Sequence, residues 1–214
     1  MKLYSYFRSS ASYRVRIALN LKGLPYEVVP VHLRRGGGEQ LAPTYRTIHA
    51  DGLVPALAVE QGVLTQSLAI IEYLEELHPL PALLPASALD RAYVRSIALA
   101  IACDIHPINN LRVLRYLAHE LKVDDTARDA WYRHWCAQGL AALEAVLARD
   151  ARTGKFCCGD TPTMADCCLV PQVLNAQRVN TDLSAMPTVM RINANCLALE
   201  AFSAAAPDRQ PDAE

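Results

Sequence analysis

The sequence predicts an α/β domain followed by an all-helical domain. In residues 1–80, short apolar runs of strand length alternate with two stretches of helical periodicity. Three prolines between 79 and 85 then stiffen the chain. Beyond them the sequence is rich in Ala, Leu and Arg and shows no hairpin signal. We therefore expect domains at 1–80 and 87–214, joined by a linker at 81–86.

The amino-terminal elements follow the order strand, helix, strand, loop, strand, strand, helix. A strand, a helix and a second strand in succession imply a parallel pair with a right-handed crossover, whereas the tight Gln61-Gly62 turn implies an antiparallel pair. Pro30 places its strand at a sheet edge or a bulge, and Gly23 ends the first helix. Such a mixed sheet is the thioredoxin-like plan. The expected strands are 3–7, 26–33, 53–59 and 63–65, and the expected helices are 12–22 and 67–78.

The second domain is expected to consist of four long helices, near 87–119, 125–150, 163–178 and 188–201. Thr163 and Asp166 have the spacing of a capping box, with aspartate in place of the usual glutamate. We interpret that pair as structural, because it would start a helix and touch no substrate.

Composition excludes several classes of protein. The chain has 214 residues, of which 52% are hydrophobic and 20% charged, so it can form a packed core. A formal net charge of −1 gives no basic field for nucleic acid or an anionic membrane. The longest apolar run, 97–103, is far short of the ~20 residues that span a bilayer, so we expect a cytoplasmic protein. The seven cysteines lack metal-site spacing and are expected to be reduced, and we expect no metal.

Three long sequence words resemble the zeta class of the glutathione-transferase superfamily: YFRSSASYRVRIAL from Tyr6, QSLAIIEYL from Gln66 and DTPTMAD from Asp160. The ending RQPD from Arg209 is similar to the family as well. The resemblance covers nearly the whole chain. It implies a thioredoxin-like domain plus an all-α domain, glutathione as cofactor, and a homodimer.

The resemblance also assigns residues to a glutathione site. Ser9 and Ser10 would lie between the first strand and the amino terminus of the first helix, where unpaired amides and the helix dipole stabilise a thiolate; the alternative is a simple N-cap. Ala11 stands where the class usually has cysteine, so the nucleophile must be the sulfur of glutathione. Val54 would precede a cis proline and pair with the cysteinyl unit. The other implied glutathione contacts are Gln40, Gln66, Ser67, His106 and Asn110.

The implied substrate is a small dicarboxylate-like anion with a cis double bond. Arginine forks clamp carboxylates, and the candidates are Arg8, Arg112 and Arg178. The expected reaction is glutathione-dependent cis–trans isomerisation of maleylpyruvate, with Ser9, Ser10 and Arg8 as catalytic residues. Maleylacetoacetate is the first alternative substrate. A general conjugating or dehalogenating transferase is a second hypothesis, and a non-catalytic glutathione-transferase-like module is a third.

Overall fold

The computed structural model describes residues 1–214 and divides into two compact units. Unit 1 comprises Met1–Leu83 together with Ala198–Glu214, and unit 2 comprises Leu84–Leu197. The chain leaves unit 1 inside the predicted linker. The segment 198–214 departs from the expected division, because it belongs to unit 1 and not to the helical unit.

Unit 1 contains a four-stranded sheet with the order β2-β1-β3-β4. β1 and β2 run parallel, while β3 is antiparallel to both β1 and β4, so the mixed sheet expected from the sequence is confirmed. β2 is an edge strand, as Pro30 predicted. The strands are β1 (Lys2–Ser5), β2 (Glu27–Pro30), β3 (Ala56–Val59) and β4 (Gly62–Thr65).

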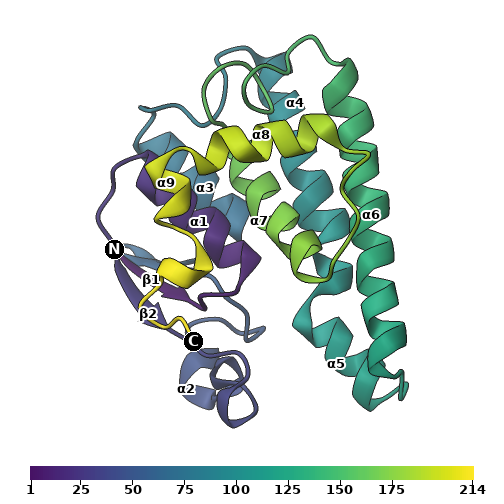
Figure 1. The fold of residues 1–214 in the computed structure, drawn as a ribbon. Coiled ribbons are helices and arrows are strands. Elements are labelled where there is room, and N and C mark those ends of the chain that lie inside the picture. Colours follow the sequence, from purple (N-terminus) through teal and green to yellow (C-terminus); the bar gives the residue numbers. More distant parts are fainter. The chain divides into compact units, whose positions relative to one another are not determined.

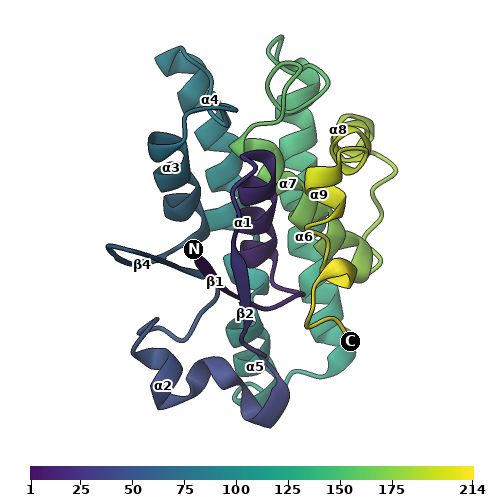
Figure 2. The same ribbon diagram turned by 90° about the vertical axis from the view of Figure 1, so that its left-hand side faces the viewer.

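Helices α1 (Ser10–Leu21) and α3 (Ser67–Leu77) pack against each other in unit 1. Figures 1 and 2 show α2 (Pro43–Arg46) apart from both. α1 buries an apolar face because Val15, Ile17 and Leu19 are fully enclosed. It ends where predicted, since Gly23 has a φ of +64° and lets the chain turn through the left-handed region.

The segment 198–214 returns to unit 1 because α1 presents polar side chains to it. Tyr13 donates to the carbonyl of Phe202 (3.1 Å), Arg16 to that of Ala205 (2.9 Å) and Asn20 to that of Ala201 (3.0 Å). In Figure 1 the short helix α9 (Glu200–Ser203, yellow) lies beside α1 (purple). Sequence periodicity could not reveal this contact, because it joins residues far apart in the chain.

Unit 2 is all-helical, as predicted. α7 is its central helix and contacts α4, α6 and α8, which accounts for the burial of most of its side chains. Its capping box is formed, because Asp166 accepts from both the backbone N–H and the hydroxyl of Thr163 (2.8 and 2.9 Å). The α-helices are α4 (Ala88–Leu99), α5 (Leu111–His119), α6 (Asp125–Arg149), α7 (Met164–Arg178) and α8 (Pro187–Leu197).

The single helix expected at 87–119 is wrong, because it is broken into several pieces. After α4 the chain forms a π-helix at Ala100–Ile105, a 3-10 helix at Pro107–Asn109, and then α5. Pro107 lacks the N–H that would continue an α-helix, and asparagine is a weak helix former.

By length and composition alone, Ala88–His119 could cross a membrane. Its apolar residues have another explanation in this fold. Val94, Ile97 and Ile101 are buried, and α4 packs against α7 within unit 2. Of the most apolar 18-residue window, 28% is buried, whereas the core helices of soluble proteins that satisfy the same criterion are mostly buried.

Candidate active site

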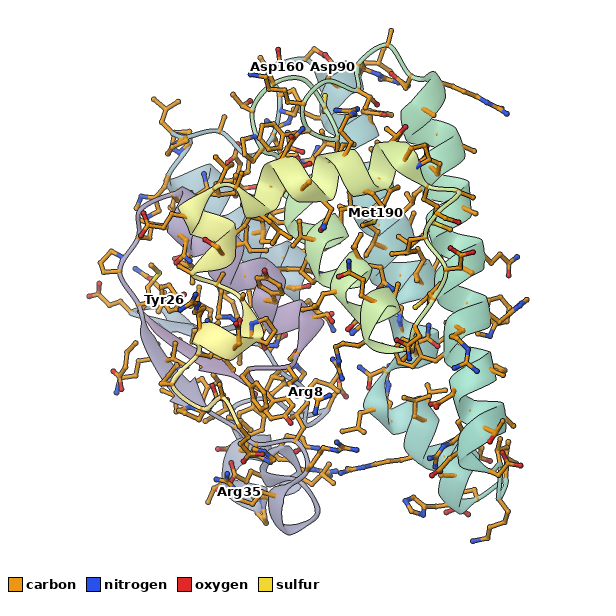
Figure 3. The ribbon with its side chains drawn as sticks, in the orientation of Figure 1. Arg8, Tyr26, Arg35, Asp90, Asp160 and Met190 are labelled. Carbon is orange, nitrogen blue, oxygen red and sulfur yellow. The ribbon has the colours of Figure 1, made fainter.

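The amino terminus of α1 is the first part of the candidate site. Ser9 is the N-cap, with an extended backbone, and its Oγ accepts a hydrogen bond from the amide of Ser12 (3.2 Å). Ser10 is buried, Ser9 is half-buried and Arg8 is exposed; Figure 3 labels Arg8. First-turn amides and the helix dipole favour an anion here. The N-cap role of Ser9 and a thiolate-binding role are therefore compatible.

The amino terminus of α3 begins from an unusual backbone conformation. Gln66 is the N-cap, and it has a φ of +68°. A non-glycine residue in that region stores about 1–3 kcal/mol of strain and is typical of functional sites. Gln66 is exposed, so its side chain is accessible, and the first-turn amides of a helix are in general a binding site for carboxylates.

Sequence reasoning missed Arg14. This residue of α1 is 2% exposed, and its Nη1 donates to the hydroxyl of the buried Ser67 over 3.2 Å. The bond ties α1 to the first residue of α3, so the two helix starts are held by a common contact. The available signal was a pair of arginines, Arg14 and Arg16, within the otherwise apolar stretch Tyr13–Leu19.

The Val54–Pro55 peptide bond is cis, as the resemblance implied. It immediately precedes β3, which pairs with β1. Tyr45 anchors the approach to this bond, because its hydroxyl donates to the carbonyl of Leu53 (2.7 Å). Burial raises the pKa of Tyr45 well above its ordinary value, so the phenol keeps the proton that it donates.

Gln40 lies in a short 3-10 helix, Glu39–Leu41, where the sequence suggested only an irregular loop. Its side chain is 5% exposed, and its Nε2 donates to Leu33 over 3.4 Å. Gly38 has a φ of +121°, which strains any other residue, and a Cβ there would lie 2.7 Å from the side-chain amide of Gln40. The Oε1 of Gln40 is buried without a hydrogen-bond partner, so it can accept one from a ligand.

Unit 2 carries the remaining candidates. His106 and Asn110 are four residues apart, but the 3-10 helix Pro107–Asn109 between them removes the α-helical spacing that would place them on one face. Asn110 caps α5 and accepts from the amide of Arg112 (3.1 Å). Asn109 is buried, and its Nδ2 donates to the sulfur of Cys136 at 3.7 Å.

Arg112 and Arg178 are both exposed, in the first turn of α5 and at the last residue of α7. The positive charge of Arg178 acts on Tyr132 of α6: burial raises the pKa of this phenol to about 12, and Arg178 opposes that rise. An exposed guanidinium at a helix end can reach an anionic ligand. Within unit 1, by contrast, Ser9, Ser10, Gln66 and Ser67 lie at helix starts that Arg14 links.

Comparison with known families gives two matches. A family model described as glutathione S-transferase, N-terminal domain, matches residues 3–82, and one described as glutathione S-transferase, C-terminal domain, matches residues 125–194. The maleylpyruvate isomerase of a Ralstonia species is 50% identical over 99% of both chains. The maleylacetoacetate isomerase of Mus musculus is 48% identical over 98% of this chain and 94% of its own.

Solved structures agree with these matches. A holo structure of a maleylpyruvate isomerase, described as a bacterial zeta-class glutathione transferase, superposes with a TM-score of 0.97 at 50% identity over all of both chains. A maleylacetoacetate isomerase from Methylobacterium extorquens, with bound malonate and glutathione, superposes with a TM-score of 0.96 at 42% identity, again over all of both chains.

Proposed function

Because the chain belongs to the glutathione S-transferase family, we propose that it is a glutathione-dependent isomerase that converts maleylpyruvate to fumarylpyruvate. The observation that carries this proposal is the 50% identity to the Ralstonia maleylpyruvate isomerase, which extends over 99% of both chains. A match of that length includes both units of the chain. Zeta-class architecture and the helix-start chemistry of unit 1 support it.

The donors and acceptors of unit 1 fit glutathione. The start of α3, with exposed Gln66 and its first-turn amides, suits the γ-glutamyl carboxylate. The backbone of Val54, beside the cis proline, suits the cysteinyl amide. Gln40 offers the unpartnered Oε1 described above as an acceptor for the glycyl amide N–H. The resemblance also implies glutathione contacts from His106 and Asn110, which stay predictions.

The α1 start would hold the sulfur. Its amides and dipole lower the pKa of a thiol placed there from about 8.5. Because the Oγ of Ser9 accepts from Ser12, the hydroxyl proton of Ser9 is directed away from that amide and can be donated. Ala11 leaves this segment without a thiol of its own. Ser9 and Ser10 would therefore stabilise the sulfur without becoming covalently modified.

Bound glutathione supplies a thiolate that adds reversibly to the cis double bond of the maleyl group, so that the bond can rotate before the sulfur leaves. The chain supplies orientation and positive charge. Arg8 lies between β1 and α1 and borders Ser9, so its exposed guanidinium is our first candidate for the substrate carboxylate. Arg112 and Arg178 are the candidates in unit 2. Guanidinium groups would also stabilise negative charge that develops on the substrate.

Maleylacetoacetate is the alternative substrate. The relatives from Mus musculus and Rhizobium meliloti carry the name maleylacetoacetate isomerase and are 48% and 49% identical to this chain. The same arginines would bind either keto acid. The ratio of kcat/KM for the two substrates, measured on one preparation, decides between them.

A turnover assay tests the proposed function. Maleylpyruvate is followed with glutathione, without it, and with S-methylglutathione, which keeps the carboxylates and amides but lacks a free thiol. We expect conversion only with glutathione, with no net glutathione consumed. Equal rates without glutathione would exclude the mechanism. Net consumption would indicate a conjugating or dehalogenating transferase, and no binding in calorimetry would indicate a non-catalytic module.

We also propose that the protein is a cytoplasmic homodimer. Its surface carries large exposed apolar side chains, which suit an interface between copies of the chain. Leu80 is 81% exposed in unit 1, and Leu89 is 74% exposed in unit 2. Light scattering coupled to gel filtration tests the proposal; a mass of one chain, 23.5 kDa, at micromolar concentration would contradict it.

A further inference from the structure

The ending RQPD resembles the family but has no part in the proposed chemistry. In the structure this segment is fixed to unit 1 by two of its side chains. Gln210 is 9% exposed, and its Nε2 donates to the carbonyls of Ala204 (3.1 Å) and Ala206 (2.9 Å). This pair of bonds folds the segment back on the turn that follows α9. Asp212, two residues later, reaches a different part of unit 1.

Asp212 and Arg16 hold the backbone of Phe7 from its two sides. The amide of Phe7 donates to Oδ2 of Asp212 over 3.0 Å, and its carbonyl accepts from Nη2 of Arg16, also over 3.0 Å. Phe7 is 6% exposed and lies beyond the end of β1, so no strand partner serves these groups. Buried backbone groups require such partners. Phe7 directly precedes Arg8 and Ser9.

Arg16 can act as a rigid anchor because all of its contacts are internal. Its side chain is fully buried, with Nε donating to Ala205 (2.9 Å) and Nη1 to the hydroxyl of Ser5 (3.0 Å). Burial lowers the pKa of Arg16 to about 10, while the negative charge of Asp212 raises it. The guanidinium is therefore charged at neutral pH, and its planar fork joins β1, Phe7 and the returning segment.

We propose that Asp212 and Arg16 are positioning residues for catalysis, which hold Phe7 from both sides and thereby fix Arg8 and Ser9 where the glutathione sulfur binds. This inference rests on the proposed function. It assigns a role to a segment more than two hundred residues away along the chain from Phe7. The two clamps act on one residue, so loss of either lets the segment before α1 shift. A shift of about 1 Å at reacting groups can reduce the rate a hundredfold.

Four variants test the clamp. Asp212→Ala removes the acceptor for the Phe7 amide, whereas Asp212→Asn removes the charge and keeps an acceptor oxygen. Arg16→Lys keeps the charge and loses the fork. Asp208→Ala is the matched control, because Asp208 is an exposed acid of the same segment. The measurements are kcat and KM for each substrate, the melting temperature, and the pKa of bound glutathione from the ultraviolet absorbance of its thiolate.

We expect Asp212→Ala and Arg16→Lys to lower kcat by about ten- to a hundredfold and to raise the pKa of the bound thiol. The kcat and the thiol pKa of Asp212→Asn should lie between those of these two variants and those of the parent. Asp208→Ala should have the parental kcat and thiol pKa. If the contacts of Asp212 and Arg16 with Phe7 only stabilise the fold, the variants should have a lower melting temperature, with parental kcat and thiol pKa in the folded fraction. That result would overturn the proposal. If Asp212→Ala does not fold, Asp212→Asn tests the proposal in its place. A parental kcat and a parental thiol pKa for Asp212→Asn would also overturn the proposal.

The thiol measurement separates this inference from the proposed function. A parent protein that binds glutathione as thiolate but does not convert maleylpyruvate would refute the isomerase. The shift in thiol pKa between the parent and Asp212→Ala would still test whether Asp212 is a positioning residue. A parent that binds no thiolate would refute both.

Discussion

The guanidinium of Arg14 donates a hydrogen bond to the hydroxyl of Ser67 over 3.2 Å, and both side chains are buried. Ser67→Ala removes the acceptor. Because hydrogen bonds to charged groups contribute about 1.5–3 kcal/mol, we expect a loss of that size in the free energy of unfolding. We also expect a higher KM for glutathione with a smaller change in kcat. Urea unfolding and steady-state kinetics measure the two effects, and Ser67→Thr, which keeps the hydroxyl, serves as the control.

The two serines of the α1 start should behave differently on substitution. Ser9 is half-buried and can donate its hydroxyl proton, whereas Ser10 is 7% exposed. We expect Ser9→Ala to lower kcat about ten- to a hundredfold, to raise the pKa of the bound thiol, and to cost about 1 kcal/mol as a lost N-cap. Ser9→Thr should retain most of the activity. A larger kcat effect from Ser10→Ala would transfer the donor role to Ser10.

Lys22 and Glu75 form an ion pair of 2.7 Å, with the lysine side chain fully buried. Lys22→Met leaves a buried carboxylate unpaired and should destabilise the fold by about 3–5 kcal/mol, with little change in kcat for the folded fraction. The double variant Lys22→Met, Glu75→Leu should recover only part of this loss. Lys22 also donates to the carbonyls of His78 and Pro81, and Glu75 accepts from the amide of Leu83. Full recovery in chemical denaturation would contradict that interpretation.

Asp150 gives unit 2 an acid-sensitive contact. Hydrogen bonds from Arg152 lower the pKa of this carboxyl from 3.8 to about 2. Because the folded pKa lies below the unfolded one, the contribution to stability is present above pH 3.8 and is lost as pH falls toward about 2. Asp150→Asn should therefore have a flatter dependence of the urea midpoint on pH in this window. Asp129→Asn, an exposed acid on α6, is the control, and equal slopes for parent and Asp150→Asn would contradict the prediction.

Local patterns predicted most of the secondary structure because they depend on neighbours in sequence. Helical periodicity located α3 to within one residue, and Pro30 indicated the edge strand. The same periodicity failed at 87–119, where the apolar pattern continues through Pro107 although the backbone does not. Hydropathy reports which residues are buried and not which carbonyl each backbone N–H bonds, so it does not distinguish a π-turn from an α-turn.

The sequence predicted the site residues that lie at a helix start. It did not predict the residues that act through a partner far away in the sequence. Ser9 lies at an N-cap that the sequence marks with serines. Arg14 and Asp212 act through partners 53 and 205 residues away, and no spacing rule connects such positions. Gln66 was found by resemblance, but its left-handed backbone was not, because glutamine has no preference for that conformation.

The return of residues 198–214 to unit 1 has a consequence for how the protein is made. A ribosome releases residues 1–83 long before Ala205 and Asp212 exist, so the buried guanidinium of Arg16 and the amide of Phe7 must wait for their partners. The sheet can pair early, but the segment that carries Arg8 and Ser9 can reach its final geometry only after unit 2 has been synthesised. We therefore expect nascent chains that stop before residue 198 to bind glutathione poorly, so that affinity for the cofactor would mark completion of the chain.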